Sequence, residues 1–158
     1  MTEDRLTTVA FTGHRTYGGQ AAAALRATVG ELYARGFRTF LCGMAMGCDL
    51  YFCEAVLELR SRHPDVTVEA AIPCPTQADA WPPDQRRRYE RLVAACDFET
   101  LGSACYTPAC MQRRDRYMVD HAMLLIAAFD GTAGGTRYTV EYALRRGIEI
   151  FDVSIPTE

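Results

Sequence analysis

Lysine is absent from this sequence of 158 residues, and all 17 basic residues are arginine. The absence excludes catalysis through a lysine Schiff base, and it excludes the phosphate-binding lysine of a Walker A loop. Arginine remains well suited to phosphate and carboxylate groups, because its planar guanidinium can donate two parallel hydrogen bonds. Basic charge is also scarce overall: the net charge is −3, whereas a dedicated duplex-DNA binder is usually basic. Any anion-binding role must therefore be local.

Metal-ligand spacings and long apolar runs are missing as well. The seven cysteines include no Cys-x-x-Cys pair and the three histidines are scattered, so we predict no metal site and no cofactor. No apolar run approaches the ~18 residues that span a membrane. The polar, acidic N-terminus does not resemble a secretory signal. We therefore expect a cytoplasmic protein with reduced cysteines and no membrane partner.

Strand and helix patterns alternate along the chain. Apolar and β-branched runs predict strands at 7–13, 37–43, 66–73, 97–101, 122–129 and 148–153. Helical spacing of apolar residues predicts helices at 18–35, 49–60, 84–95, 108–121 and from a glycine loop to 146. Asp49 is predicted to cap its helix, and Gly147 to end the last one. We predict one domain over 1–158 with an α/β, Rossmann-like fold, a three-layer sandwich in which helices cover both faces of a mainly parallel sheet.

Glycine-bearing loops follow three of these predicted strands, at 12–15, 43–49 and 130–136. The carboxyl ends of parallel strands meet at one edge of a sheet, where ligands bind near the point at which strand order reverses. Each loop leads into a predicted helix, whose first N–H groups and dipole attract anions. The candidate ligand-binding residues at this edge are Gly13, His14, Arg15, Gly43, Met44, Gly47, Asp49, Asp130, Gly131, Gly134, Gly135 and Thr136.

Simpler interpretations exist for several of these residues. Gly43 and Gly47 are also explained by tight turns, and His14 by a surface position with satisfied hydrogen bonds. The arginines at 86–91 are interpreted mainly as a solvated helix face. Arg114 differs from them, because it precedes the most apolar predicted strand within the same crossover unit as the last glycine loop.

Five segments carry a resemblance to a known family. In chain order they are FTGHR, CGMAMGCDLYFCEAVL, AAIPCPTQADAW, RRDRYMVDHAMLLIAAFDGTAGGT and TVEYA. Together they resemble the YpsA-like branch of the SLOG superfamily, over about residues 8 to 153. This superfamily also includes the cytokinin-activating LOG phosphoribohydrolases and the DNA-processing protein DprA. The resemblance implies a Rossmann-like fold and a nucleotide-type small molecule as partner at the glycine loops.

The similarity to LOG enzymes suggests two catalytic residues. LOG enzymes carry a Met-x-x-Arg segment and a Gly-Gly-x-Gly-Thr-x-x-Glu loop, whose arginine and glutamate serve in N-glycosidic cleavage of nucleoside 5′-monophosphates. Residues 111–114 match the first segment, which gives Arg114 the arginine position. Thr139 stands where LOG enzymes have glutamate, and the nearest carboxylate, Glu141, lies ~200° further around a helix. Asp115 also replaces a LOG lysine, so Arg114 and Glu141 are catalytic candidates of an altered site.

Three classes of function stay open. The first, which we favour, is a binding module or ligand sensor that holds a nucleotide derivative, with its phosphate at 134–136 and Arg15 or Arg114 as countercharge. The second is an N-glycosidic hydrolase of a nucleoside 5′-monophosphate that uses Glu141. The third is single-stranded nucleic-acid binding as in DprA, but the acidic charge balance argues against nucleic acid as a partner. A homodimer is left open, although the sequence has no interface signature.

Overall fold

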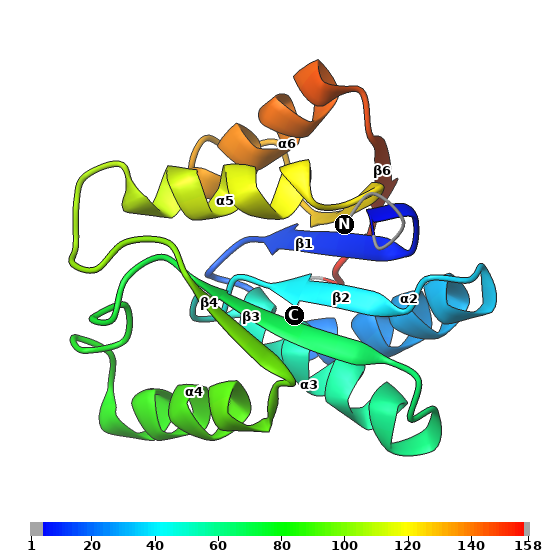
Figure 1. The fold of residues 1–158 in the computed structure, drawn as a ribbon, viewed down its shortest axis with the longest axis horizontal. Helices are drawn as coiled ribbons and strands as arrows, with labels where there is room; N and C mark the ends of the chain where they lie inside the picture. Colours follow the sequence, from blue (N-terminus) through cyan, green and yellow to red (C-terminus); the bar gives the residue numbers. More distant parts are fainter. Residues whose placement is uncertain (1–4, 157–158) are drawn as a thin grey trace.

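A computed structural model describes residues 5–156 of the chain. Figure 1 shows a six-stranded sheet between two layers of helices. The strands are β1 (Thr8–Gly13), β2 (Thr39–Cys42), β3 (Thr67–Ile72), β4 (Phe98–Leu101), β5 (Leu124–Ala128) and β6 (Glu149–Asp152). They pair in parallel throughout, in the order β4-β3-β2-β1-β5-β6. The predicted α/β, Rossmann-like sandwich is confirmed, with a sheet that is entirely parallel.

The helices have nearly the predicted bounds. They are η1 (Gly19–Ala21), α2 (Ala22–Ala34), α3 (Cys48–Arg62), α4 (Pro83–Ala95), α5 (Cys110–Asp120) and α6 (Gly135–Arg146). Figure 1 shows α2, α3 and α4 on one face of the sheet and α5 and α6 on the other. Gly147 ends α6 in the left-handed conformation that favours glycine, as predicted. Within residues 5–156, no helix has the length and apolar character needed to cross a membrane.

The core lies on both faces of the sheet. All residues of β5 are buried, because helices cover both of its faces, although β1 and β2 rather than β5 form the middle of the sheet. On the α2–α3 side, the ring of Phe11 stacks on that of Phe52 with centroids 4.4 Å apart. On the α5–α6 side, Met118, Leu125 and Ala143 belong to a second buried cluster.

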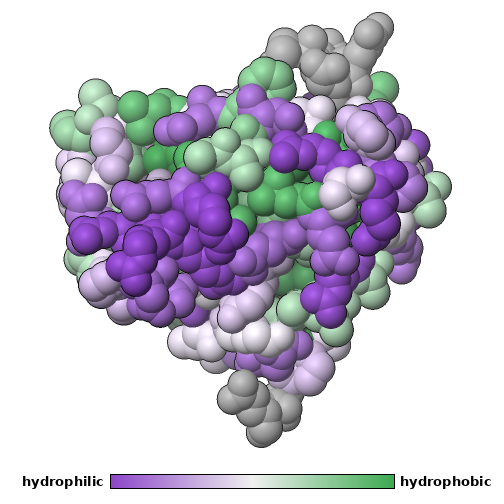
Figure 2. Space-filling model, turned by 90° about the horizontal axis from the view of Figure 1, so that it is seen from below, coloured by the Kyte–Doolittle hydropathy of each residue, from purple (hydrophilic) through white to green (hydrophobic). Residues whose placement is uncertain are grey.

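The outer face of α4 carries the arginine run. Figure 2 shows the molecule from below Figure 1, and much of this face is hydrophilic. Arg86, Arg87 and Arg91 are exposed there, as expected for a solvated helix face. Arg88 differs, because its guanidinium pairs with the Glu54 carboxylate of α3 and its side chain is only 15% exposed. Arg91 also lies 3.9 Å from Glu54 Oε2, so Arg88, with this weaker contact beside it, fastens α4 to α3.

The strand order reverses at β1. The chain runs outward from β1 through β2 and β3 to β4, and then crosses back to β5 on the other side of β1. The loops after β1 and β5 therefore leave the sheet toward opposite faces, which opens a gap above the carboxyl ends of these strands. This edge is where the glycine-bearing loops were predicted to meet.

Candidate functional site

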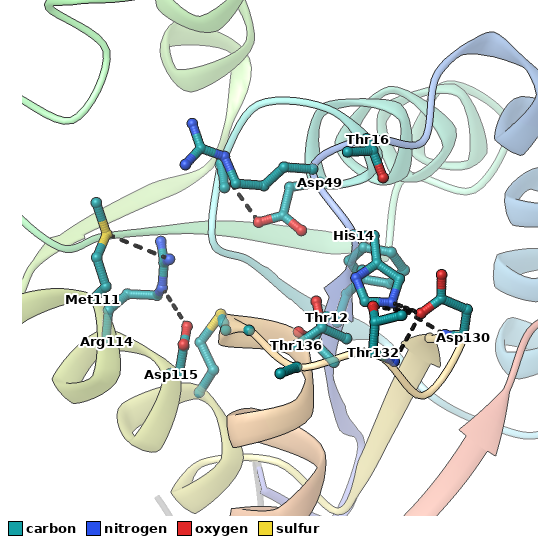
Figure 3. A pocket seen from close by; sticks show the side chains of 18 of the residues that line it. Thr12, His14, Thr16, Asp49, Met111, Arg114, Asp115, Asp130, Thr132 and Thr136 are labelled. Atoms are coloured by element: carbon teal, nitrogen blue, oxygen red, sulfur yellow. Dashed lines mark hydrogen bonds and ion pairs between the residues drawn. The ribbon is translucent and has the colours of Figure 1, made fainter.

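A cleft of about 440 Å³ lies at the carboxyl edge of β1 and β5. Its volume is in the range of ~300–1,000 Å³ that is typical of small-molecule sites. Figure 3 shows side chains from the loops after β1 and β5 on one side of the cleft and side chains of α5 on the other. The loops after β2 and β3 complete the lining with Ala45, Gln77 and Trp81. The cleft thus lies at the reversal of strand order.

Nine of the residues predicted for the site line this cleft. They are Gly13, His14, Arg15, Asp49, Arg114, Asp130, Gly134, Gly135 and Thr136. The other five, which are Gly43, Met44, Gly47, Gly131 and Glu141, are not among the lining residues. The glycine-bearing loops therefore do gather at one edge, but several of their glycines serve the loops themselves.

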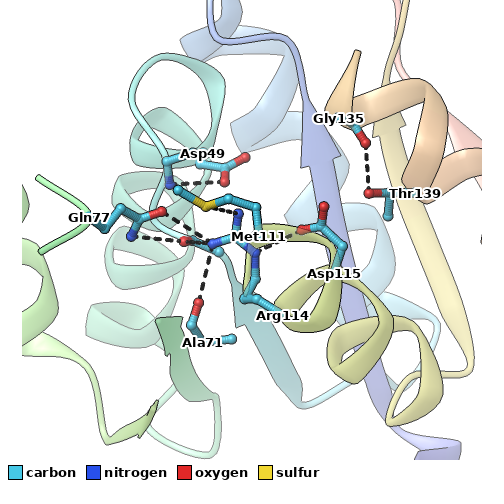
Figure 4. Close-up of polar contacts among 10 residues, drawn as sticks. Asp49, Ala71, Gln77, Met111, Arg114, Asp115, Gly135 and Thr139 are labelled. Atoms are coloured by element: carbon cyan, nitrogen blue, oxygen red, sulfur yellow. Dashed lines mark hydrogen bonds and ion pairs between the residues drawn. The ribbon is translucent and has the colours of Figure 1, made fainter. Parts of the chain in front are cut away.

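Glu141 lies on the exposed side of α6. Its side chain is 52% exposed, and its Oε2 accepts a hydrogen bond from Arg137 Nε at 3.3 Å. Thr139, at the position of the LOG glutamate, is buried and donates its hydroxyl proton to the carbonyl oxygen of Gly135 at 2.9 Å (Figure 4). The structure therefore does not bring Glu141 to the cleft, because two residues along a helix turn a side chain to nearly the opposite side.

Gly13 and Gly47 allow two rim loops to touch through their backbones. Gly47 has a φ of +87°, and a Cβ atom there would lie 2.2 Å from the carbonyl oxygen of Arg15. A Cβ atom at Gly13 would lie 2.9 Å from that of Cys48. The loop after β1 therefore rests directly on the first turn of α3, and only glycine permits this approach.

Asp49 does not cap α3, contrary to the prediction. Gly47 occupies the N-cap position and has no side chain that could cap the helix. The carboxylate of Asp49 instead accepts a hydrogen bond from the N–H of Ala45 at 3.1 Å. The helix starts before Asp49, which places this residue in its first turn. Asp49 is only 6% exposed, and burial raises the pKa of its carboxyl to about 7, although the nearby Arg114 opposes the shift. The cleft therefore contains a carboxyl group that titrates near neutral pH.

Arg114 fastens α5 to the ends of β2 and β3 (Figure 4). Its Nη1 donates to the carbonyl oxygens of Gly43 and Ala71, and it lies 3.3 Å from Oε1 of Gln77. Its Nε donates to Asp115 Oδ1 at 2.7 Å. The side chain is 7% exposed, so most of its donors are used inside the protein. Arg114 is therefore first of all a structural tie between elements that line the cleft.

Gly43 lies between Arg114 and Asp49. A Cβ atom at this position would be 3.0 Å from Nη1 of Arg114 and 3.1 Å from Oδ2 of Asp49. Among residues 5–156 these two side chains form no ion pair within 4.0 Å, and the carboxylate paired with Arg114 is that of Asp115. Burial raises the pKa of Asp115, and the guanidinium of Arg114 opposes this change.

Asp130 is held in a turn at the rim. Its Oδ1 accepts hydrogen bonds from the backbone N–H of Thr132 at 3.0 Å and from the Thr132 hydroxyl at 2.7 Å. His14 Nε2 lies 2.7 Å from the same oxygen. The hydrogen bonds from Thr132 hold the pKa of Asp130 below its usual value, with a smaller contribution from His14. One carboxylate oxygen of Asp130 is thus engaged within the loop.

The N-terminus of α6 opens into the cleft. The N-cap residue Gly134 has a φ of +144°, which disfavours a side chain, and no side chain of the described residues caps the helix. Gly135 has neither a positive φ nor any atom within 4 Å of the place where a Cβ would lie. Arg15 is exposed and has no ion-pair partner within 4.0 Å in the described part of the chain. This end of the cleft therefore offers hydrogen-bond donors and positive charge.

Comparison with known proteins identifies the family. The model of the YpsA family, described as the YspA SLOG family, matches residues 19–150. The chain belongs to the YpsA SLOG family. The resemblance noted in the sequence is thereby confirmed.

Curated relatives of this YpsA family member have no described activity in their names. The uncharacterized SPbeta prophage-derived protein YoqJ of Bacillus subtilis (strain 168) is 32% identical over 116 residues, which cover 66% of this chain and 68% of YoqJ. A UPF0398 protein of Halalkalibacterium halodurans is 26% identical over 118 residues, covering 73% of this chain and 62% of that protein. These similarities extend the family without assigning it a reaction.

Two solved structures of DprA are similar in fold to this YpsA family member. DprA from Streptococcus pneumoniae superposes with a TM-score of 0.69 at 17% identity, over 94% of this chain and 50% of DprA. DprA from Helicobacter pylori, described for its single-stranded DNA binding mode, gives a TM-score of 0.68 at 16% identity, over 94% of this chain and 66% of DprA. At these identities the similarity shows the fold alone.

Several lining residues of this YpsA family member were not predicted as site residues. They include Gln77, Trp81, Met111, Asp115 and Thr132. The loop after β3 carries no glycine, so the pattern that marked the other loops missed Gln77 and Trp81. Topology supplies the missing signal, because β3 is parallel to β1 and its following loop must reach the same edge.

Proposed function

We propose that the cleft binds a nucleotide or nucleotide derivative through its phosphate, and that the protein acts as a binding module. The observation that carries this proposal is the N-terminus of α6, which no side chain of residues 5–156 caps and which lines a cleft at the reversal of strand order. The phosphate accepts hydrogen bonds from the first N–H groups of α6, where the helix dipole favours negative charge. Gly134 and Gly135 leave room for its oxygens to approach the backbone.

Arg15 supplies the countercharge. Of the two arginines in the cleft, Arg114 already donates to Asp115 and to backbone carbonyl oxygens, whereas Arg15 is exposed and unpaired among the described residues. A guanidinium that is free to move can meet a phosphate with two parallel hydrogen bonds. Arg15 therefore contributes more to phosphate affinity than Arg114 does.

The remainder of the ligand lies toward α5. Asp49 lines this part of the cleft, and only its Oδ2 is engaged, by the N–H of Ala45, so Oδ1 accepts a hydrogen bond from a sugar hydroxyl. Asp130 has one oxygen engaged by Thr132 and His14, and its Oδ2 is a second candidate acceptor for a sugar hydroxyl. Trp81 and Met111 offer apolar surface to a base.

A ligand screen tests the proposal directly. Thermal shift and titration calorimetry should compare nucleoside monophosphates, ADP-ribose and dinucleotides with the corresponding nucleosides. We expect the phosphorylated compounds to raise the Tm and the nucleosides to have little effect. If no phosphorylated compound in the screen binds, the proposal is wrong.

The variant G135D places a carboxylate at the phosphate position. The space at Gly135 is open and its φ is not positive, so we expect this variant to fold. An aspartate at the start of a helix stabilises it, and the same charge repels a phosphate. Binding should be lost in G135D and retained in the matched variant G135A. Equal affinities in these two variants would place the phosphate elsewhere.

Single-stranded nucleic acid is a second candidate ligand. The Helicobacter pylori DprA with this fold is described as a single-stranded DNA binder. A phosphodiester can use the same helix N-terminus as a mononucleotide, and binding would weaken steeply with added salt. Retention of a labelled single-stranded oligonucleotide at low salt, lost in G135D, would favour this candidate over a mononucleotide.

N-glycosidic cleavage stays a hypothesis that lacks its predicted carboxylate at the cleft. Glu141 pairs with Arg137 outside the cleft, and the lining carboxyl groups near α5 are those of Asp49 and Asp115. An assay for free base released from AMP separates binding from hydrolysis. We expect no release that depends on Glu141.

A further inference from the structure

Helices α3 and α4 bring two cysteine thiols into contact. Cys53 lies on α3 and is fully buried, and Cys96 follows the last residue of α4 and is partly exposed. Their Sγ atoms are 3.9 Å apart, and both cysteines are free. A third cysteine, Cys42 at the end of β2, also contacts Cys53 but is completely buried. Of these three thiols, Cys96 is the one that solvent reaches.

Polar contacts hold the backbone on both sides of this thiol pair. Arg60, two turns beyond Cys53 on α3, donates from Nη1 to Asp97 Oδ2 and from Nη2 to the carbonyl oxygen of Ala95, each at 2.8 Å. On the other side, Arg88 of α4 donates from Nε to Glu54 Oε2 at 3.1 Å. The residues next to both cysteines are therefore fixed relative to each other. Closing the 3.9 Å separation to a disulfide of about 2.05 Å requires each sulfur to move by about 1 Å.

We propose that Cys53 and Cys96 form an oxidative modification site, in which a peroxide converts the two thiols into a disulfide that joins α3 to α4. The Cys96 thiol loses its proton to solvent and the thiolate attacks one oxygen of the peroxide, so that the O–O bond breaks and a sulfenic acid forms. The hydroxide that leaves takes up that proton and becomes water. The Cys53 sulfur then attacks the Cys96 sulfur, the S–O bond breaks and a second water leaves. Two thiols and one hydrogen peroxide thus yield one disulfide and two waters.

The local environment makes this reaction slow and dependent on pH. Contact with Cys53 and burial both raise the pKa of the Cys96 thiol, so little thiolate is present at neutral pH. Oxidation therefore proceeds faster as the pH rises. The exposed Cys105 lies in the loop before α5 and serves as an internal reference for a thiol without these constraints.

The disulfide connects two elements that flank the cleft. Asp49 lies one helical turn before Cys53 on α3 and lines the cleft, and the loop that leads into α4 contributes Gln77 and Trp81. Oxidation therefore restricts the packing of α3 against α4 beside the site. This inference does not depend on which ligand the cleft binds.

Oxidation of the full chain with hydrogen peroxide tests the site. Peptide mapping without reduction should find Cys53 linked to Cys96, and dithiothreitol should reverse the link. The closed loop joins residues 43 positions apart, so we expect the Tm to rise by about 5–10 °C. The variant C96S should show neither the link nor the rise, whereas C105S should show both.

Three results would overturn the proposal. The first is that Cys105 is oxidised while Cys53 and Cys96 stay reduced even at alkaline pH. The second is a link from Cys53 to Cys42 in place of Cys96. The third is that Cys96 is found as a sulfinic acid while Cys53 stays a free thiol, which would mean that Cys53 does not attack the sulfenic acid. A fall in the Tm of C96S after peroxide reports methionine oxidation and is the baseline for the Tm comparison.

Discussion

At the α6 end of the cleft Gly134 and Gly135 expose the backbone, whereas at the α5 end Arg114 is buried and pairs with the partly buried Asp115. The same residue type behaves differently at the two ends. Arg15 is exposed and has no ion pair in the described part of the chain, while Arg114 donates to three oxygen acceptors and the Met111 sulfur besides Asp115. The α6 end therefore leaves backbone donors and the Arg15 charge open to the cleft. At the α5 end, the charge of Arg114 is used to hold together the elements that line the cleft.

Replacement of Arg114 should have the largest effect on stability. R114M leaves the largely buried carboxylate of Asp115 without its cation and the carbonyl oxygens of Gly43 and Ala71 without their donor. Removal of one partner from a buried pair costs about 3–5 kcal/mol. Urea denaturation of R114M should show this loss. R15M should change stability by less than about 0.5 kcal/mol, and equal losses in the two variants would contradict the contrast between the ends.

Gly47 should be the next most sensitive position. In G47A the new methyl group meets the carbonyl oxygen of Arg15 at 2.2 Å, and the φ of +87° is strained for alanine. We expect a loss of about 2–4 kcal/mol in the free energy of unfolding, measured by urea denaturation. G135A is the matched control, because its Cβ meets open space and its φ is permissive. It should be neutral or stabilising.

The buried carboxyl of Asp49 should make stability depend on pH. Its pKa rises from 3.8 in the unfolded chain to about 7 in the folded protein, so the folded state holds the proton more tightly. Stability therefore falls as the pH rises from about 4 to 7 and is constant above that range. Between pH 5 and pH 8 the loss should be about 2–3 kcal/mol. D49N should remove this part of the pH dependence, as followed by urea denaturation at each pH.

Asp130 provides the opposite sign. Its pKa is lowered in the folded protein, so its contribution is present at neutral pH and is lost as the pH falls through its folded value. D130N should therefore lower stability at neutral pH and remove part of the pH dependence only on the acidic side. If D49N and D130N changed the pH dependence of stability over the same pH range, the assignment of the neutral titration to Asp49 would be wrong.

The smallest expected effect concerns ligand affinity. R15Q removes one charge-assisted contact with the phosphate, which is worth about 1.5 kcal/mol, or roughly tenfold in Kd. R26Q, which changes an exposed arginine on α2, should leave the Kd unchanged. The measurement is calorimetric titration with the best phosphorylated compound of the screen. A Kd for R15Q equal to that of R26Q would remove Arg15 from the site.

Sequence patterns predicted the exposed backbone at the α6 end of the cleft, but they did not predict the side-chain contacts at the α5 end. Gly134 and Gly135 signal an exposed turn before a helix, and alternating apolar patterns predict the strands that bring such turns to one edge. Asp49 was predicted for the site, but its predicted role as the N-cap was wrong, because the helix begins before it, with Gly47 held by contact with the backbone of Arg15. Such a contact joins loops more than thirty residues apart, and no local pattern reports it.

The contacts of Gln77 and Arg114 also could not be predicted from local sequence patterns. Arg114 was found by its motif, but its buried hydrogen bonds to Gly43 and Gln77 depend on the packing of α5 over β2 and β3. Periodicity places a residue on a face of a helix and does not say which carbonyl oxygens that face meets. Sequence alone could not decide whether Arg15 or Arg114 is the countercharge. The tertiary structure is needed, because it shows that Arg114 already has partners inside the protein.

The contact between Gly47 and the backbone of Arg15 also has a mechanical meaning. The two loops touch through their backbones, with no flexible side chain between them that could absorb a movement. A displacement of one loop therefore moves the other. A displacement of the Arg15 backbone is therefore expected to move the first turn of α3, which extends from Cys48 to Arg62. If Arg15 binds the ligand as proposed, binding therefore also acts on the position of α3.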